Sequence, residues 1–69
     1  MTPSYVTANG EQLAVEFPCS LEQFLLHRQL LPRSVVIEHN GEAVSPSQFA
    51  TRPLQSGDHL EIVKIVAGG

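Results

Sequence analysis

The residues with the clearest potential for chemistry are the last ones, Val66-Ala67-Gly68-Gly69. Glycine lacks a side chain and adopts backbone conformations closed to other residues, so paired glycines form a thin tether that fits a narrow channel. The α-carboxylate of Gly69 is ionised at neutral pH, and it can attack the α-phosphate of ATP to form a reactive acyl-adenylate. That reaction requires a partner enzyme. The competing interpretation is that the two glycines are an inert end, since chain termini are often poorly ordered and tolerate substitution by other small residues.

Cysteine and histidine give weaker signals. Cys19 is the single cysteine, and although a helix start can activate a thiol, a small residue that fits the strand-to-helix turn is the favoured interpretation. Zinc binding by Cys19 and the histidines is disfavoured, because their spacing matches no closed zinc signature. We expect solvated or lightly bonded imidazoles, and these are His27, His39 and His59.

The acidic residues do not predict an active site. Glu38 and Glu42 flank a turn and not a cleft, so paired-carboxylate catalysis has no support. Asp58 follows a glycine and suits a turn. A chain of 69 residues buries a thin core and has little room for an enclosed active site. We therefore do not expect an enzyme in its own right, and we expect no bound cofactor and no metal; a reaction of the terminal carboxylate would depend on a partner enzyme.

Composition restricts the partners and the compartment. The net charge of −3 and the pI of about 5.4 argue against nucleic-acid binding. The apolar stretches are far shorter than the ~20 residues that span a bilayer, so no membrane role is expected. One cysteine cannot form an internal disulfide and no secretory leader is evident, which favours the cytoplasm. We expect one domain over residues 1–66 and a flexible tail over residues 67–69.

Periodicity and turn residues predict the elements that must position this tail. Apolar alternation or β-branched residues indicate strands over 5–8, 11–17, 35–39, 42–44 and 59–66. Asn9-Gly10 and Asn40-Gly41 are strong hairpin signals. Ser20 with Gln23 forms a capping box that opens a short helix. Arg28 falls on the apolar stripe of this helix, so either the helix has left the core at that point or the Arg28 side chain snorkels over the core's edge. A turn or a single helical turn is expected over residues 46–49.

This order predicts an α+β domain of the β-grasp type: a mixed sheet of four to five strands packed on one helix. A right-handed crossover through the helix predicts that the third strand is parallel to the first. In the last strand, alternation leaves Glu61, Val63 and Ile65 on the face away from the helix. We predict a patch there that docks partner proteins, although Val63 and Ile65 also simply fit strand propensity.

The chain resembles the ThiS-type sulfur carriers of thiamine biosynthesis, which are ubiquitin-like β-grasp proteins. The resemblance is carried by Asn9-Gly10-Glu11, Ser20-Leu21, the run from Val36 to Val44 (VIEHNGEAV), and the run from Leu54 to Val63 (LQSGDHLEIV) that leads to the diglycine. It covers nearly the whole length. The chain departs from the family at Ser45-Pro46-Ser47, where a basic residue is common, and at Arg28, where an aliphatic residue is usual.

The resemblance implies a carrier cycle on Gly69. An E1-like adenylyltransferase binds the domain, holds Ala67 and Gly68 in a channel, and uses ATP to adenylate Gly69. A cysteine desulfurase or another persulfide donor then supplies sulfur, which leaves a thiocarboxylate that a thiazole synthase uses. Two alternatives stay open: the small subunit of molybdopterin synthase, with the same terminal chemistry, and a β-grasp interaction module or ubiquitin-like modifier without sulfur transfer.

Overall fold

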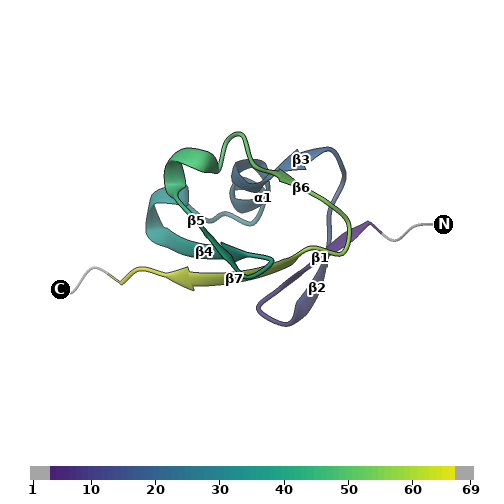
Figure 1. The fold of residues 1–69 in the computed structure, drawn as a ribbon, viewed down its shortest axis with the longest axis horizontal. Helices are drawn as coiled ribbons and strands as arrows, with labels where there is room; N and C mark the ends of the chain where they lie inside the picture. The colour runs from purple at the N-terminus through teal and green to yellow at the C-terminus, as the bar shows by residue number, and fades with distance from the viewer. Residues whose placement is uncertain (1–3, 67–69) are drawn as a thin grey trace.

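A mixed sheet of five strands forms one layer of the protein, in the order β2-β1-β7-β4-β5 (Figure 1). The structure is a computed structural model that describes residues 4–66. β1 and β7 are parallel, and the other neighbouring pairs are antiparallel. The strands are β1 (Tyr5–Ala8), β2 (Glu11–Ala14), β4 (Val35–His39), β5 (Glu42–Val44) and β7 (His59–Lys64).

The second layer is helix α1 (Leu21–His27), which covers one face of this sheet (Figure 1). Ser20 caps the helix: its hydroxyl accepts from the backbone N–H of Gln23, whose side chain accepts from the backbone N–H of Ser20. The helix buries Leu21, Phe24 and Leu25 and ends before Arg28, which is exposed. The predicted α+β fold of a mixed sheet on one helix is confirmed.

Both predicted hairpin turns are present. Asn9 and Gly10 have φ of 51° and 84°, and Asn40 and Gly41 have φ of 52° and 84°. Positive φ at both central residues defines a type I′ turn, whose twist matches that of the flanking strands. Asparagine tolerates this left-handed conformation better than other residues with side chains. The two Asn-Gly pairs therefore set the register of β1 with β2 and of β4 with β5.

The predicted strand direction was wrong in one respect. The third long strand, β4, is antiparallel to β7, which is itself parallel to β1, so β4 and β1 run in opposite directions. The parallel crossover connects β1 to β7 instead. Residues 45–58 make the connection that allows this, since they cross from the edge strand β5 back to the centre of the sheet.

Two predicted strands are shorter than expected because their partners end. β2 stops at Ala14, which pairs with Tyr5 at the start of β1, and not at residue 17. β7 stops at Lys64, which pairs with Val35 at the start of β4, and not at residue 66. The backbone N–H of Ile65 still donates to the carbonyl of Ser34 over 2.7 Å, so the chain follows β4 one residue further.

Three small elements complete the fold. A second sheet pairs β3 (Cys19–Ser20) with β6 (Pro53–Leu54). A 3₁₀ turn, η1 (Pro32–Ser34), precedes β4, and η2 (Pro46–Gln48) is the predicted helical turn after β5. Within residues 4–66 no helix has the length and apolar character needed to cross a membrane. The core between the layers consists of Val6, Ala8, Val15, Cys19, Leu21, Phe24, Leu25, Val35, Ile37, Val44, Phe49, Leu54 and Leu60.

Candidate functional site

The residues predicted to carry and thread the chemical group, Gly69, Gly68 and Ala67, lie outside the described residues. What the structure describes is the surface that leads to them. That surface belongs to β7, the central strand of the sheet, and to its neighbours. The candidate site is therefore built from the face that β7 presents away from helix α1.

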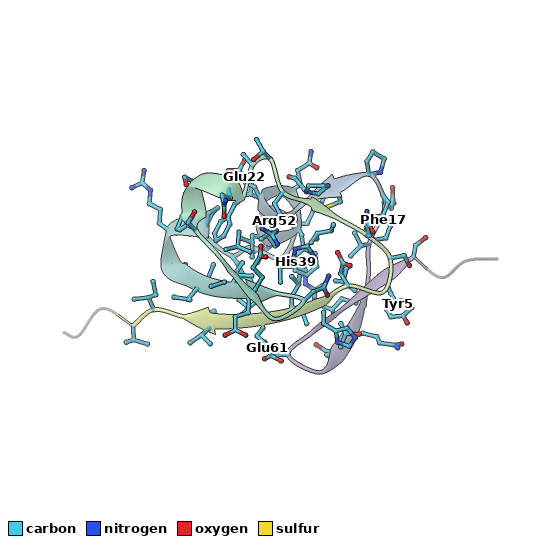
Figure 2. The ribbon with its side chains drawn as sticks, in the orientation of Figure 1. Tyr5, Phe17, Glu22, His39, Arg52 and Glu61 are labelled. Carbon is cyan, nitrogen blue, oxygen red and sulfur yellow. The ribbon has the colours of Figure 1, made fainter. Side chains whose placement is uncertain are left out.

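Side chains along β7 alternate between the two faces as predicted. Leu60 is 1% exposed and packs in the core, and Ile62 packs partly against it. Glu61 and Val63 lie on the opposite face, and Val63 is 63% exposed. Figure 2 shows Glu61 below β7, on the side away from helix α1. Ile65 continues beyond the strand and is also exposed.

The register adds two neighbours that sequence reasoning missed. Val36 of β4 lies directly opposite Val63, and Glu38 lies directly opposite Glu61. Val36 is 54% exposed although its neighbours Val35 and Ile37 are buried. We name this group the outer-face surface; its members are Val36, Glu38, Glu61, Val63 and Ile65. The available signal was the alternation around Val36, but strand pairing cannot be read from one sequence.

β7 is held in place by side chains as well as by its ladders. The side chain of Asn9 donates to the carbonyl of Ile62 over 3.0 Å and accepts from the N–H of Ile62 over 2.7 Å. At the start of the strand, the side chain of Asn40 accepts from the N–H of His59 over 2.8 Å. Both turn asparagines thus bind the backbone of β7, and the outer-face surface lies on a fixed support.

A network of hydrogen-bonded polar side chains lies at the other end of β7. It shows that the expectation of a solvated or lightly bonded imidazole was wrong for His39. His39 is 7% exposed and is hydrogen-bonded at both ring nitrogens. Figure 2 shows it beside Arg52. Arg52 Nε donates to His39 Nδ1 over 2.9 Å, so the proton of the neutral ring is on Nε2, which donates to Asp58 over 2.7 Å. Arg52 also forms an ion pair with Glu42 over 2.7 Å.

Asp58 connects this side-chain network to the turn that precedes β7. Its carboxylate accepts from the backbone N–H of Gln55 over 2.8 Å, which closes the predicted turn, and from Asn40 over 3.2 Å. Burial raises the pKa of Asp58, but the hydrogen bonds from His39, Gln55 and Asn40 outweigh it and leave the pKa below its usual value. The carboxylate is a structural acceptor that joins the turn to the sheet.

The remaining reactive side chains do not form a site. Cys19 is buried in β3, and burial raises the pKa of its thiol, which opposes the thiolate form that reacts. Its sulfur lies 3.4 Å from the carbonyl of Ser20. Among residues 4–66 no three His, Cys, Asp or Glu side chains gather as a metal site would require. The candidate site is therefore the outer-face surface, and partner docking there stays a prediction.

Comparisons with known proteins agree with this geometry. The crystal structure of the thiamine biosynthesis protein (ThiS) from Geobacter metallireducens superposes with a TM-score of 0.79 at 24% identity, covering 94% of this chain and 99% of that one. A solution structure of a thiamine biosynthesis protein from the same organism gives a TM-score of 0.76 at 24% identity, covering 94% and 87%. These likenesses confirm the β-grasp fold.

Sequence comparison goes beyond the fold. A protein named thiazole synthase from Magnetococcus marinus is 33% identical over 61 residues, which are 88% of this chain and 19% of that protein. The chain thus spans about a fifth of the length of this relative. The ThiS family matches residues 6–69, nearly the whole sequence. The resemblance seen in the sequence is confirmed, and the chain belongs to the ThiS family.

Proposed function

We propose that this chain is a sulfur carrier of thiamine biosynthesis that presents its C-terminal Gly69 as a thiocarboxylate for formation of the thiazole ring. The observation that supports this most directly is that the ThiS family match extends through Gly69, so it includes the diglycine. A carboxylate that is carried on two glycines can reach a reacting centre inside another protein.

The curated relative supports the pathway. The segment that matches this chain lies within a longer protein named thiazole synthase. When a small domain and an enzyme share one chain, the effective concentration of each for the other is high, which suits a carrier and its acceptor enzyme. This favours thiazole formation over the molybdopterin alternative, and it favours sulfur delivery over an inert interaction module.

The chemistry proceeds in three steps on Gly69. The carboxylate attacks the α-phosphate of ATP on an E1-like adenylyltransferase, and the products are the acyl-adenylate and pyrophosphate. A cysteine persulfide, supplied by a cysteine desulfurase route, then attacks the activated carbonyl carbon and displaces AMP. A second cysteine thiol attacks the resulting acyl disulfide, which releases the thiocarboxylate and leaves a disulfide between the two cysteines. The partners supply every catalytic acid and base.

The carrier contributes recognition. We assign docking to Val63, Ile65 and Glu61, joined by their neighbours on β4. Exposed valine and isoleucine side chains remove apolar area from water when a partner covers them, at about 25 cal/mol per Å². Because β7 runs directly towards the tail, a partner that covers this strand is positioned to receive Gly69.

The test is the mass of the intact, untagged chain after incubation with a cognate adenylyltransferase, ATP and a persulfide donor. The expected result is an oxygen-to-sulfur mass increase that maps to the C-terminal peptide. The control is a chain without Gly69, which should keep its fold and gain neither AMP nor sulfur. An unmodified carboxylate in the full-length chain, or sulfur transfer to the truncated one, would refute the proposal.

A further inference from the structure

Two carboxylates face each other on the outer-face surface. Glu38 and Glu61 are directly opposite in the antiparallel β4–β7 ladder, and both are exposed. The Cβ atoms of such a pair are about 4.5–5.5 Å apart, and like charges in this arrangement destabilise a sheet. The sheet therefore carries an unfavourable interaction in its central ladder, next to the exposed Val36–Val63 pair.

No cation among residues 4–66 forms an ion pair with either carboxylate. Neither carboxylate forms a hydrogen bond or an ion pair with any of residues 4–66. Arg52 is bound to Glu42 and His39. Lys64 pairs with the buried Val35 and lines a depression beside Arg28 on the helix side of the sheet. Arg33 lies in η1, before β4 begins.

We propose that the Glu38–Glu61 pair is the charge that the adenylyltransferase recognises, through a lysine or arginine side chain that it places over both carboxylates. This rests on the proposed function. An enzyme that brings ATP and a second anion, the Gly69 carboxylate, into one site must surround them with positive groups. The pair lies on the strand that leads to this carboxylate, so an enzyme that covers this strand can place a positive group beside the pair.

The same charge disfavours other occupants of this face. A second copy of the chain that packed through a two-fold axis would bring four carboxylates together. A nucleic acid would add phosphate charge to the same surface. An apolar partner alone would bury the pair without compensation, which costs more than the contact between valines returns. A cationic partner both covers the valines and removes the repulsion.

This assignment predicts two effects of opposite sign. Glu61→Gln and Glu38→Gln remove the repulsion, so each variant should unfold at a higher denaturant concentration than the parent chain. The same variants should bind the adenylyltransferase more weakly, on the order of tenfold for the double variant, with the loss mostly in the association rate and smaller at high salt. A role in folding alone gives the first effect without the second.

The experiment measures ATP–pyrophosphate exchange by the adenylyltransferase against carrier concentration at several salt concentrations, together with urea unfolding of each carrier. Glu11→Gln with Glu16→Gln is the matched control, because it removes the same charge from exposed positions outside the outer-face surface. Normal exchange with the Glu38 and Glu61 variants overturns the inference. If these variants support normal exchange but lose sulfur delivery to a thiazole synthase, the pair contacts that enzyme and not the adenylyltransferase, which also overturns the inference. A parent chain that supports no exchange overturns the proposed function itself.

Discussion

The side-chain amide of Asn9 forms a two-point hydrogen bond with the backbone of Ile62, donating over 3.0 Å and accepting over 2.7 Å. The backbone ladder between β1 and β7 pairs only Thr7 with His59 and Ala8 with Leu60. Asn9 acts as one more rung of this short parallel ladder. The strand that presents the outer-face surface is thus held by the tip of the first hairpin, far away in sequence.

Substitutions of Asn9 should separate the contribution of its positive φ in the turn from that of its two side-chain hydrogen bonds to Ile62. Asn9→Gly keeps the positive φ of the turn and removes the two side-chain bonds, so we expect a loss of about 1–3 kcal/mol in the free energy of unfolding. Asn9→Ala should lose roughly 1 kcal/mol more, because alanine is strained at φ of 51°. Urea unfolding measures both. Equal stability of the parent chain and Asn9→Gly would show that the bonds to Ile62 contribute nothing.

The Asp58 carboxylate should make stability depend on pH in the acid range. The pKa of Asp58 is lowered in the folded state, so its contribution is present above the unfolded pKa of about 3.9 and is lost as pH falls through the lower folded value. Asp58→Asn removes this contribution, and we expect a loss of about 1–3 kcal/mol at neutral pH.

Unfolding curves from neutral pH to below the folded pKa test this prediction. The difference between the parent chain and Asp58→Asn should narrow as the pH falls, because the parent chain protonates its carboxylate. Glu11→Gln serves as the control, since Glu11 is exposed in β2 and has no such hydrogen bonds. If the difference in the free energy of unfolding between the two proteins stays constant across the acid range, the assigned role of Asp58 is contradicted.

Cys19 should be dispensable for sulfur transfer. Its thiol is buried and its pKa is raised by burial, so alkylation of the folded chain should be slow and should become rapid in urea. Cys19→Ala should lose about 1 kcal/mol of stability and still form the thiocarboxylate. Loss of sulfur transfer in a folded Cys19→Ala chain would assign the thiol a chemical role. Because the sequence has one cysteine, the variant also leaves the thiocarboxylate as the only group with thiol-type reactivity, which simplifies mass mapping.

Local signals predicted the fold well. Asn9-Gly10 and Asn40-Gly41 set two hairpins, and the Ser20–Gln23 capping box set the helix start, because each depends on residues a few positions apart. The predicted direction of β4 and the predicted ends of β2 and β7 were wrong, because strand length and direction depend on partner strands elsewhere in the chain.

The residues of the candidate site also fall into two groups: those that a local pattern predicts and those that depend on strand pairing. The outward direction of Glu61 and Val63 follows from alternation within one strand, so the sequence predicted it. Their neighbours Val36 and Glu38 depend on register, and the His39–Arg52 contact joins residues 13 apart that no local pattern relates. Hydrogen bonding at both ring nitrogens needs a three-dimensional arrangement, which explains why His39 was expected to be only lightly bonded.

Val63→Asp should weaken adenylation of Gly69 without unfolding the domain. Val63 is 63% exposed, so the folded state changes little, while a partner that covers the strand must bury a new carboxylate beside the Glu38–Glu61 pair. We expect the carrier concentration needed for half-maximal exchange to rise by about tenfold or more. Leu26→Asp is the control, because Leu26 is 54% exposed on the helix, which covers the opposite face of the sheet. Equal effects of the two substitutions would show a loss through charge or folding, and normal exchange with Val63→Asp would remove Val63 from the docking surface.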